Sequence, residues 1–226
     1  NPTTTAIFTI STTTSASLTN DQQGQIGSSN GSTTVTTGAL NNQSGSLLAK
    51  EDIRLSTLAL DNSSGQISGG TVAIDSHQQN LTNTLGKIIS TAGASSIQSG
   101  ALVNHGGVIQ AAGTLNINTH EKSLSNAQQG LIASTDNAQL ATGTLDNSTG
   151  RIQAGGTAAA TATTPEQTLL ADISISASGP MQNVGGMVEA SRNVDIAAQG
   201  LDNSQGSVLA ANALTVQSAD AVRNSA

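Results

Sequence analysis

The residues that most often carry chemistry are few in this chain, which has three histidines, seven Lys or Arg and no cysteine. His77 and His120 fall at similar points of two related segments, and His105 falls in a different turn. If such segments stack like neighbouring strands, two steps place His77 and His120 roughly 10 Å apart. Ligands of one metal ion must lie within about 2 Å of it. We therefore predict no metal site and interpret the histidines as exposed turn residues.

Carboxylate groups are the next candidates, because paired carboxylates supply acid and base in the cleavage of polysaccharides. Asp61, Asp146 and Asp202 occupy the same turn position in segments that are not adjacent, and the basic residues do not accompany them. The sequence also has no phosphate-binding loop and no nucleophilic serine motif. A polysaccharide-active enzyme is thus less favoured than a structural segment or a binding module. We predict no catalytic residue, no cofactor and no enzymatic activity.

Charge and hydrophobicity exclude two further classes of partner, nucleic acids and the membrane interior. The formal net charge is −7 with a pI near 4.6, and the basic residues are scattered singly, so nothing in the chain would follow a phosphate backbone. No apolar run is long enough for a membrane-spanning helix. We therefore predict neither nucleic-acid binding nor membrane insertion. Phe8 is the only aromatic residue, so any core must consist of Ile, Leu, Val and Ala.

The elements that would position these residues repeat along the whole chain. An apolar residue, any residue and then Asn recur every 20 to 22 residues, with one longer interval between Asn147 and Asn183. A Gly follows most of these Asn after three residues, and an apolar residue follows the Gly. We expect this Gly to supply backbone freedom at a corner. Repetition at a fixed period is the sequence signature of a solenoid.

Alternating apolar residues, such as Ile53 and Leu55 or Ile173 and Ile175, follow later in each unit and predict short strands with one face inward. One unit cannot bury its apolar face alone, but stacked units can. We therefore predict an all-β fold, a parallel β-helix of about ten coils of ~21 residues. Residues 1–226 form one such segment, with 1–17 as an incomplete N-terminal coil.

The recurring Asn predicts a ladder of stacked side-chain amides, which is a known stabilising feature of cross-β packing. Its expected members are Asn42, Asn62, Asn83, Asn104, Asn126, Asn147, Asn183 and Asn203. The alternative interpretation, that these Asn contact a ligand, is less favoured because a fixed period indicates architecture.

The long interval indicates an inserted loop over residues 157–172. Pro165 followed by Glu166 is compatible with the start of a short helix. One hypothesis is that Leu169 and Leu170 pack on the side of the rod and form a small partner-binding surface, because loops on rigid scaffolds often carry binding residues. The alternative is ordinary variation in coil length.

The segments "LDNSTGRIQAGG", "LDNSSGQISGG", "LVNHGGVIQAAGTLNI" and "MQNVGGMVEASRNVDI" resemble the repeats of filamentous hemagglutinin and of the large exoproteins of bacterial two-partner secretion. That group includes the effectors of contact-dependent growth inhibition. The resemblance covers residues 18–226. It implies a right-handed parallel β-helix in a secreted filament at the bacterial cell surface, with an outer-membrane secretion partner. It also implies a role in adhesion or in toxin delivery.

We therefore expect a structural stalk segment that extends a distal module from the cell. The second possibility is a module that binds a target-cell receptor or a carbohydrate through the inserted loop or one face of the β-helix. The chain starts without a signal peptide and stops soon after a new signature begins, so we expect an internal segment of a longer rod.

Overall fold

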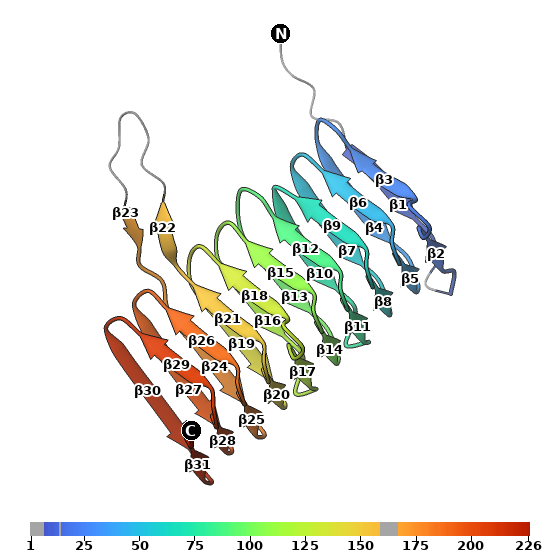
Figure 1. Ribbon diagram of the computed structural model, residues 1–226. Coiled ribbons are helices and arrows are strands. Elements are labelled where there is room, and N and C mark those ends of the chain that lie inside the picture. Colours follow the sequence, from blue (N-terminus) through green and yellow to red (C-terminus); the bar gives the residue numbers. More distant parts are fainter. Residues whose placement is uncertain (1–6, 14, 159–166) are drawn as a thin grey trace.

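The computed structural model describes residues 7–13, 15–158 and 167–226, and all regular structure within them is β-strand. Three long sheets, which we call A, B and C, run side by side along one axis (Figure 1). The chain visits A, B and C in turn and then starts the next coil. Every pairing within these sheets is parallel. The predicted all-β parallel solenoid of about ten coils is therefore confirmed.

Sheet A consists, in stacking order, of β1 (Ile7–Ser11), β4 (Ser32–Thr36), β7 (Asp52–Ser56), β10 (Thr71–Asp75), β13 (Ser95–Gln98), β16 (Leu115–Asn118), β19 (Ala138–Thr142), β24 (Ile173–Ala177), β27 (Asn193–Ala198) and β30 (Ala213–Ser218). Sheet B consists of the two-residue strands β2 (Leu18–Thr19), β5 (Leu40–Asn41), β8 (Leu60–Asp61), β11 (Leu81–Thr82), β14 (Leu102–Val103), β17 (Leu124–Ser125), β20 (Leu145–Asp146), β25 (Met181–Gln182), β28 (Leu201–Asp202) and β31 (Val222–Arg223). Sheet C consists of β3 (Gln25–Ser28), β6 (Ser46–Ala49), β9 (Gln66–Gly69), β12 (Lys87–Ser90), β15 (Val108–Ala111), β18 (Leu131–Ser134), β21 (Arg151–Ala154), β26 (Met187–Ala190) and β29 (Ser207–Ala210).

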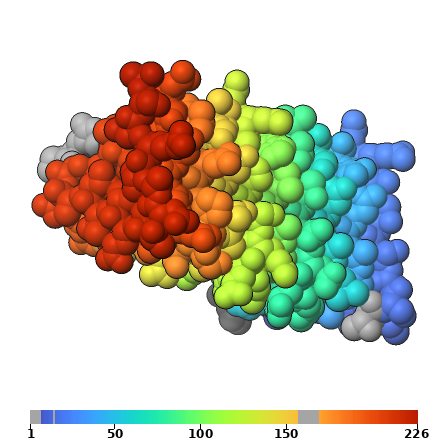
Figure 2. Space-filling model, turned by 90° about the horizontal axis from the view of Figure 1, so that it is seen from below, coloured from blue at the N-terminus to red at the C-terminus, as the bar shows by residue number. Residues whose placement is uncertain are grey.

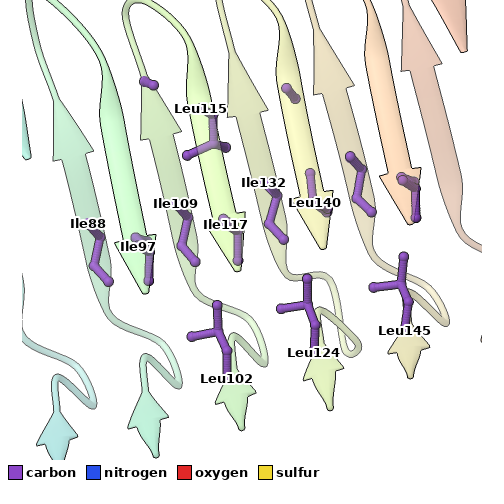
Figure 3. Packing of buried hydrophobic residues seen from close by; sticks show 14 of the residues in the cluster. Ile88, Ile97, Leu102, Ile109, Leu115, Ile117, Leu124, Ile132, Leu140 and Leu145 are labelled. Carbon is purple, nitrogen blue, oxygen red and sulfur yellow. The ribbon is translucent and has the colours of Figure 1, made fainter. Parts of the chain in front are cut away.

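The core lies between the sheets as columns of equivalent side chains. In sheet C, Ile88 pairs with Ile109 and Ile109 with Ile132, and all three are fully buried (Figure 3). Because side chains alternate along a strand, the residues between them face outward. The inward assignments made from the alternating pattern hold throughout the interior coils. In β30, the last strand of sheet A, Leu214 and Val216 belong to the same columns but are 49% and 37% exposed.

The stacking makes the molecule one-dimensional in the sense that each coil contacts its neighbours in sequence. Figure 2 shows this as successive bands of colour along the surface. The described residues contain no helix with the length and apolarity needed to cross a bilayer.

The long interval in the repeat leaves the stacking uninterrupted, because β20 pairs with β25 and β19 with β24 in the usual register. The extra residues leave the rod between sheets C and A. Their described ends form an antiparallel pair, β22 (Gly156–Ala158) and β23 (Gln167–Leu169), which projects from the solenoid (Figure 1). Pro165 and Glu166, and with them the predicted short helix, lie outside the described residues.

Candidate functional site

Side-chain amides line the turn between sheets B and C, which we call the Asn corner. Each ladder Asn donates a hydrogen bond from Nδ2 to Oδ1 of the Asn in the next coil, at 2.6–2.8 Å. The chain of bonds runs through Asn20, Asn42, Asn62, Asn83, Asn104, Asn126, Asn147, Asn183, Asn203 and Asn224. The structure thus brings together all eight Asn predicted to stack, and adds one at each end.

The side-chain nitrogen of each ladder Asn also lies close to backbone carbonyl oxygens. Asn83 Nδ2, for example, approaches Gly86 O of its own turn at 3.3 Å and Val108 O of the next coil at 3.2 Å. Asn83 and Asn104 are fully buried. A buried amide is stabilising only when its donors and acceptors are satisfied, and the stacked arrangement supplies those partners from the two neighbouring coils. Asn62 in "NSS" and Asn147 in "NST" fit the sequence pattern for N-glycosylation, but both are ladder residues and fully buried.

The recurring Gly at this corner has a different role from the one expected. A Cβ atom on Gly107 would lie 2.1 Å from Asn83 O, and one on Gly186 would lie 2.1 Å from Asn147 O. The left-handed backbone belongs instead to the preceding residue, for example Gly185 with φ of 60°. In other coils that left-handed position holds Ser64 or Leu85. The Gly is therefore required by close approach to the ladder backbone of the preceding coil rather than by conformational freedom.

The recurring carboxylates belong to the same corner. Asp61, Asp146 and Asp202 each accept a hydrogen bond from the backbone N–H two residues later, which fixes the start of the turn. Burial acts to raise the pKa of Asp61, but hydrogen bonds from Ser63 and Gln43 outweigh it and leave this pKa below its usual value. Hydrogen bonds from Ser204 lower the pKa of Asp202 in the same way. These groups cap turns, and each bonds within its own corner.

A second polar column lines the turn between sheets A and B, which we call the hydroxyl corner. Its buried members are Thr37, Thr57, Ser76, Ser99, Thr119 and Thr142. Most of these hydroxyls donate to a carbonyl of their own turn, as Ser76 does to Gln79 O at 2.6 Å. Thr119 Oγ1 also lies 2.9 Å from Thr142 Oγ1 of the next coil. This column was not predicted from the sequence, although a Ser or Thr two residues after the alternating apolar pair would have indicated it.

His77 and His120 both lie in the hydroxyl corner, on coils separated by one further coil, and His105 lies in the Asn corner. His77 Nε2 is 3.0 Å from Ser56 Oγ, and its Nδ1 is 3.6 Å from Asp75 Oδ2. This order of groups is that of a serine nucleophile with its base. The second distance is too long for a hydrogen bond, however, and both His77 and Asp75 have side chains more than half exposed. Water therefore competes for every partner, and the arrangement is poorly suited to activating Ser56.

The inserted hairpin is held to the rod at its base. Ser191 Oγ donates to Leu169 O and accepts from Ala171 N. Asp172 forms a two-point ion pair with Arg192, which together with the Asn193 backbone lowers the pKa of Asp172. Leu169 is half-buried, but Leu170 is 62% exposed, so the expectation that Leu170 packs on the rod is wrong. Backbone and ionic contacts, rather than apolar packing, fix the base of the hairpin.

Among the described residues, no three His, Asp or Glu side chains gather as a metal site would require. The site that the geometry defines is instead a repeated one: a parallel β-solenoid whose coils are joined by a buried amide ladder. This is the architecture of a repeat protein in which each unit contacts its neighbours.

Comparison with protein families agrees with that class. The chain matches the Haemagglutinin repeat family over residues 9–84, 68–122, 110–185 and 182–226, and it therefore belongs to this family. Comparisons with curated proteins and with solved structures find no significant match.

Proposed function

We propose that this chain is a stiff stalk segment of a secreted, surface-exposed filament that holds a distal module away from a bacterial cell. The observation that supports the proposal most is continuity: the three sheets and the amide ladder run through every coil, including the one that carries the hairpin. With about 4.8 Å per coil, ten coils extend for roughly 50 Å. Hydrogen bonds along the axis oppose both stretching and bending.

Membership of the Haemagglutinin repeat family supports a filamentous adhesin-type stalk. We place the chain within an exoprotein of two-partner secretion, either an adhesin or a carrier for contact-dependent growth inhibition, which crosses the outer membrane through a dedicated secretion partner. The distal module is then a binding or toxic domain, and this segment sets its distance from the cell.

Length is the property that tests a stalk. Residues 84–104 make up one coil from ladder Asn to ladder Asn. The chain would be anchored on a surface by its N-terminus and would carry a C-terminal epitope, whose height is measured by atomic force microscopy. Each added copy of 84–104 should raise the epitope by about 5 Å and preserve the β-sheet circular dichroism spectrum.

Inserting only residues 84–93 is the matched control, because half a coil places polar residues in the core columns and should unfold the neighbouring coils. An epitope height that does not change with added full coils would contradict the stalk function.

A second candidate function is partner binding by the hairpin, since exposed Leu170 stands beside a base that is fixed by Ser191 and Arg192. The partner would be a target-cell receptor or a glycan. Deleting residues 158–170 should abolish capture of target cells while the melting temperature stays within a few degrees. Deleting residues 84–104, which leaves the hairpin in place, should preserve capture. Unfolding on deletion of 158–170 would show that the loop belongs to the core.

A further inference from the structure

The hydroxyl corner changes in length from coil to coil, and one change creates a groove. The turn after β16 has five residues, 119–123, whereas the turns after β19 and β24 are short, at 143–144 and 178–180. The long turn leans over the next coil, because a Cβ on Gly143 would lie 2.1 Å from Glu121 O. Beyond it the short turns leave a polar groove of about 510 Å³.

The wall of this groove is held in place by hydrogen bonds. The carbonyl oxygen of Lys122 accepts from Thr119 Oγ1 at 2.6 Å, from Thr142 Oγ1 at 2.8 Å and from Gly143 N at 2.7 Å. His120 and Glu121 both have left-handed backbone, with φ of 49° and 61°. Non-glycine residues remain in that region only where the surroundings fix them. The wall is therefore already formed before any ligand arrives.

The groups that line the groove can both donate and accept hydrogen bonds. Ser176 and Ser178 are exposed, and their hydroxyls have no hydrogen-bond partner within the described residues. His120 Nδ1 is 3.0 Å from Ser99 O, and since a carbonyl only accepts, Nδ1 carries the hydrogen. Neutral His120 thus keeps Nε2 as an acceptor. Ala141 lies between Asn118 and Ser176 in the register of sheet A, and its small side chain leaves space in the groove.

We propose that this groove binds an uncharged saccharide residue through its hydroxyl groups. Sugar hydroxyls donate and accept at once, which matches Ser176, Ser178, Glu121 and the free edge of His120. Charge argues against an acidic sugar or a phosphate, because Glu121 lines the groove, none of its lining residues is Lys or Arg, and the whole chain carries −7. The inference goes beyond the stalk function, since a rod of full length and stiffness does not need an occupied groove.

His77 provides a matched control. Its turn has the same left-handed backbone at His77 and Gln78, with φ of 49° and 62°. Only one short turn separates it from the long turn of His120, whose imidazole contacts Ser99 of the coil between them. The open groove lies beside His120, on the side of β19 and β24. The two turns therefore differ in their neighbours, and of the two histidines only His120 should affect binding.

The experiment is an NMR titration of the isotope-labelled chain with methyl α-mannoside, methyl β-galactoside and methyl β-glucoside. We expect saturable shifts of the His120, Glu121, Ser176 and Ser178 amides with at least one glycoside. The double variant Ser176→Ala, Ser178→Ala should weaken binding roughly three- to thirtyfold, and His120→Ala by a similar factor. His77→Ala should bind like the unmodified chain. Melting curves of each variant establish that the fold is retained.

Absence of saturable shifts at these four residues with all three glycosides would overturn the proposal. Saturable shifts with spermine or calcium but not with the glycosides would overturn it as well, because the groove would then recognise cations through Glu121. Equal weakening by His77→Ala and His120→Ala would also count against it. None of these outcomes bears on the epitope-height measurement that tests the stalk.

Discussion

The Asn corner and the hydroxyl corner connect sheet B to its two neighbours, yet they accept very different amounts of variation. At the Asn corner every coil places an amide at the same point, and each amide bonds to the coils on both sides. At the hydroxyl corner the turn length varies, and Ala177 and Ala198 replace the hydroxyl in two successive coils before Ser218 restores it. Bonds between coils fix one corner, whereas the hydroxyls bond mainly within their own turn. The turn with the continuous ladder changes by at most one residue between coils, whereas the turn without it changes more.

The largest expected effect tests the core that both corners share. Ile109→Asp places a carboxylate in a fully buried column between Ile88 and Ile132, and should destabilise the chain by about 4 kcal/mol or prevent folding. Gln110→Asp, one residue on and facing outward, should change stability by less than about 0.5 kcal/mol. Urea denaturation followed by circular dichroism measures both. Similar losses would disprove the inward and outward assignments.

Two adjacent glycines, Gly185 and Gly186, test whether close approach or left-handed backbone explains the recurring Gly of the Asn corner. Gly186→Ala puts a methyl group 2.1 Å from Asn147 O and should destabilise by roughly 3 kcal/mol, because backbone of the neighbouring coil must move. Gly185→Ala meets nothing nearer than 3.7 Å and incurs only the left-handed backbone, about 1 kcal/mol. Thermal unfolding compares the two. The reverse order would restore conformational freedom as the reason for the recurring Gly.

The two corners can be compared directly by removing one polar group from each. Asn104→Ala removes the shortest hydrogen bond that Asn83 donates and the ladder bond that Asn126 accepts, so we expect a loss of about 2–3 kcal/mol. Thr119→Ala removes the hydroxyl that bonds to Lys122 O and contacts Thr142 Oγ1, and it should lose about 1 kcal/mol. Equal losses in denaturant unfolding would mean that the hydroxyl corner is as constrained as the Asn corner.

The smallest expected effect concerns the corner that carries the hairpin. The pKa of Asp172 is lowered by Arg192, so its ionised form stabilises the fold above the usual carboxyl pKa, and this stability is lost as pH falls through the lowered value. Asp172→Asn should therefore flatten the acid limb of the stability profile without changing the melting temperature greatly at pH 7. The ion pair is partly exposed, which keeps its contribution small. An unchanged acid limb would show that the ion pair does not hold the hairpin base.

Sequence alone predicted the fold because its two signals, the spaced Asn and the alternating pairs such as Val72 and Ile74, repeat in nearly every coil. It missed what depends on contacts between coils. Gly107 looks like any turn glycine until Asn83 O is placed beside it. The groove beside Glu121 requires knowing which turns are neighbours, and Ser176 comes from beyond the insertion. Leu170 was misassigned because hydrophobicity alone does not say whether a loop returns to the rod.

The amide ladder also gives the rod a sense of direction. Every Nδ2 points toward the following coil and every Oδ1 toward the preceding one. A coil added in the reverse orientation would set donor against donor. A new coil can therefore bond to the coil already in place in only one orientation. The side-chain amides thus fix the direction in which coils are added along the filament.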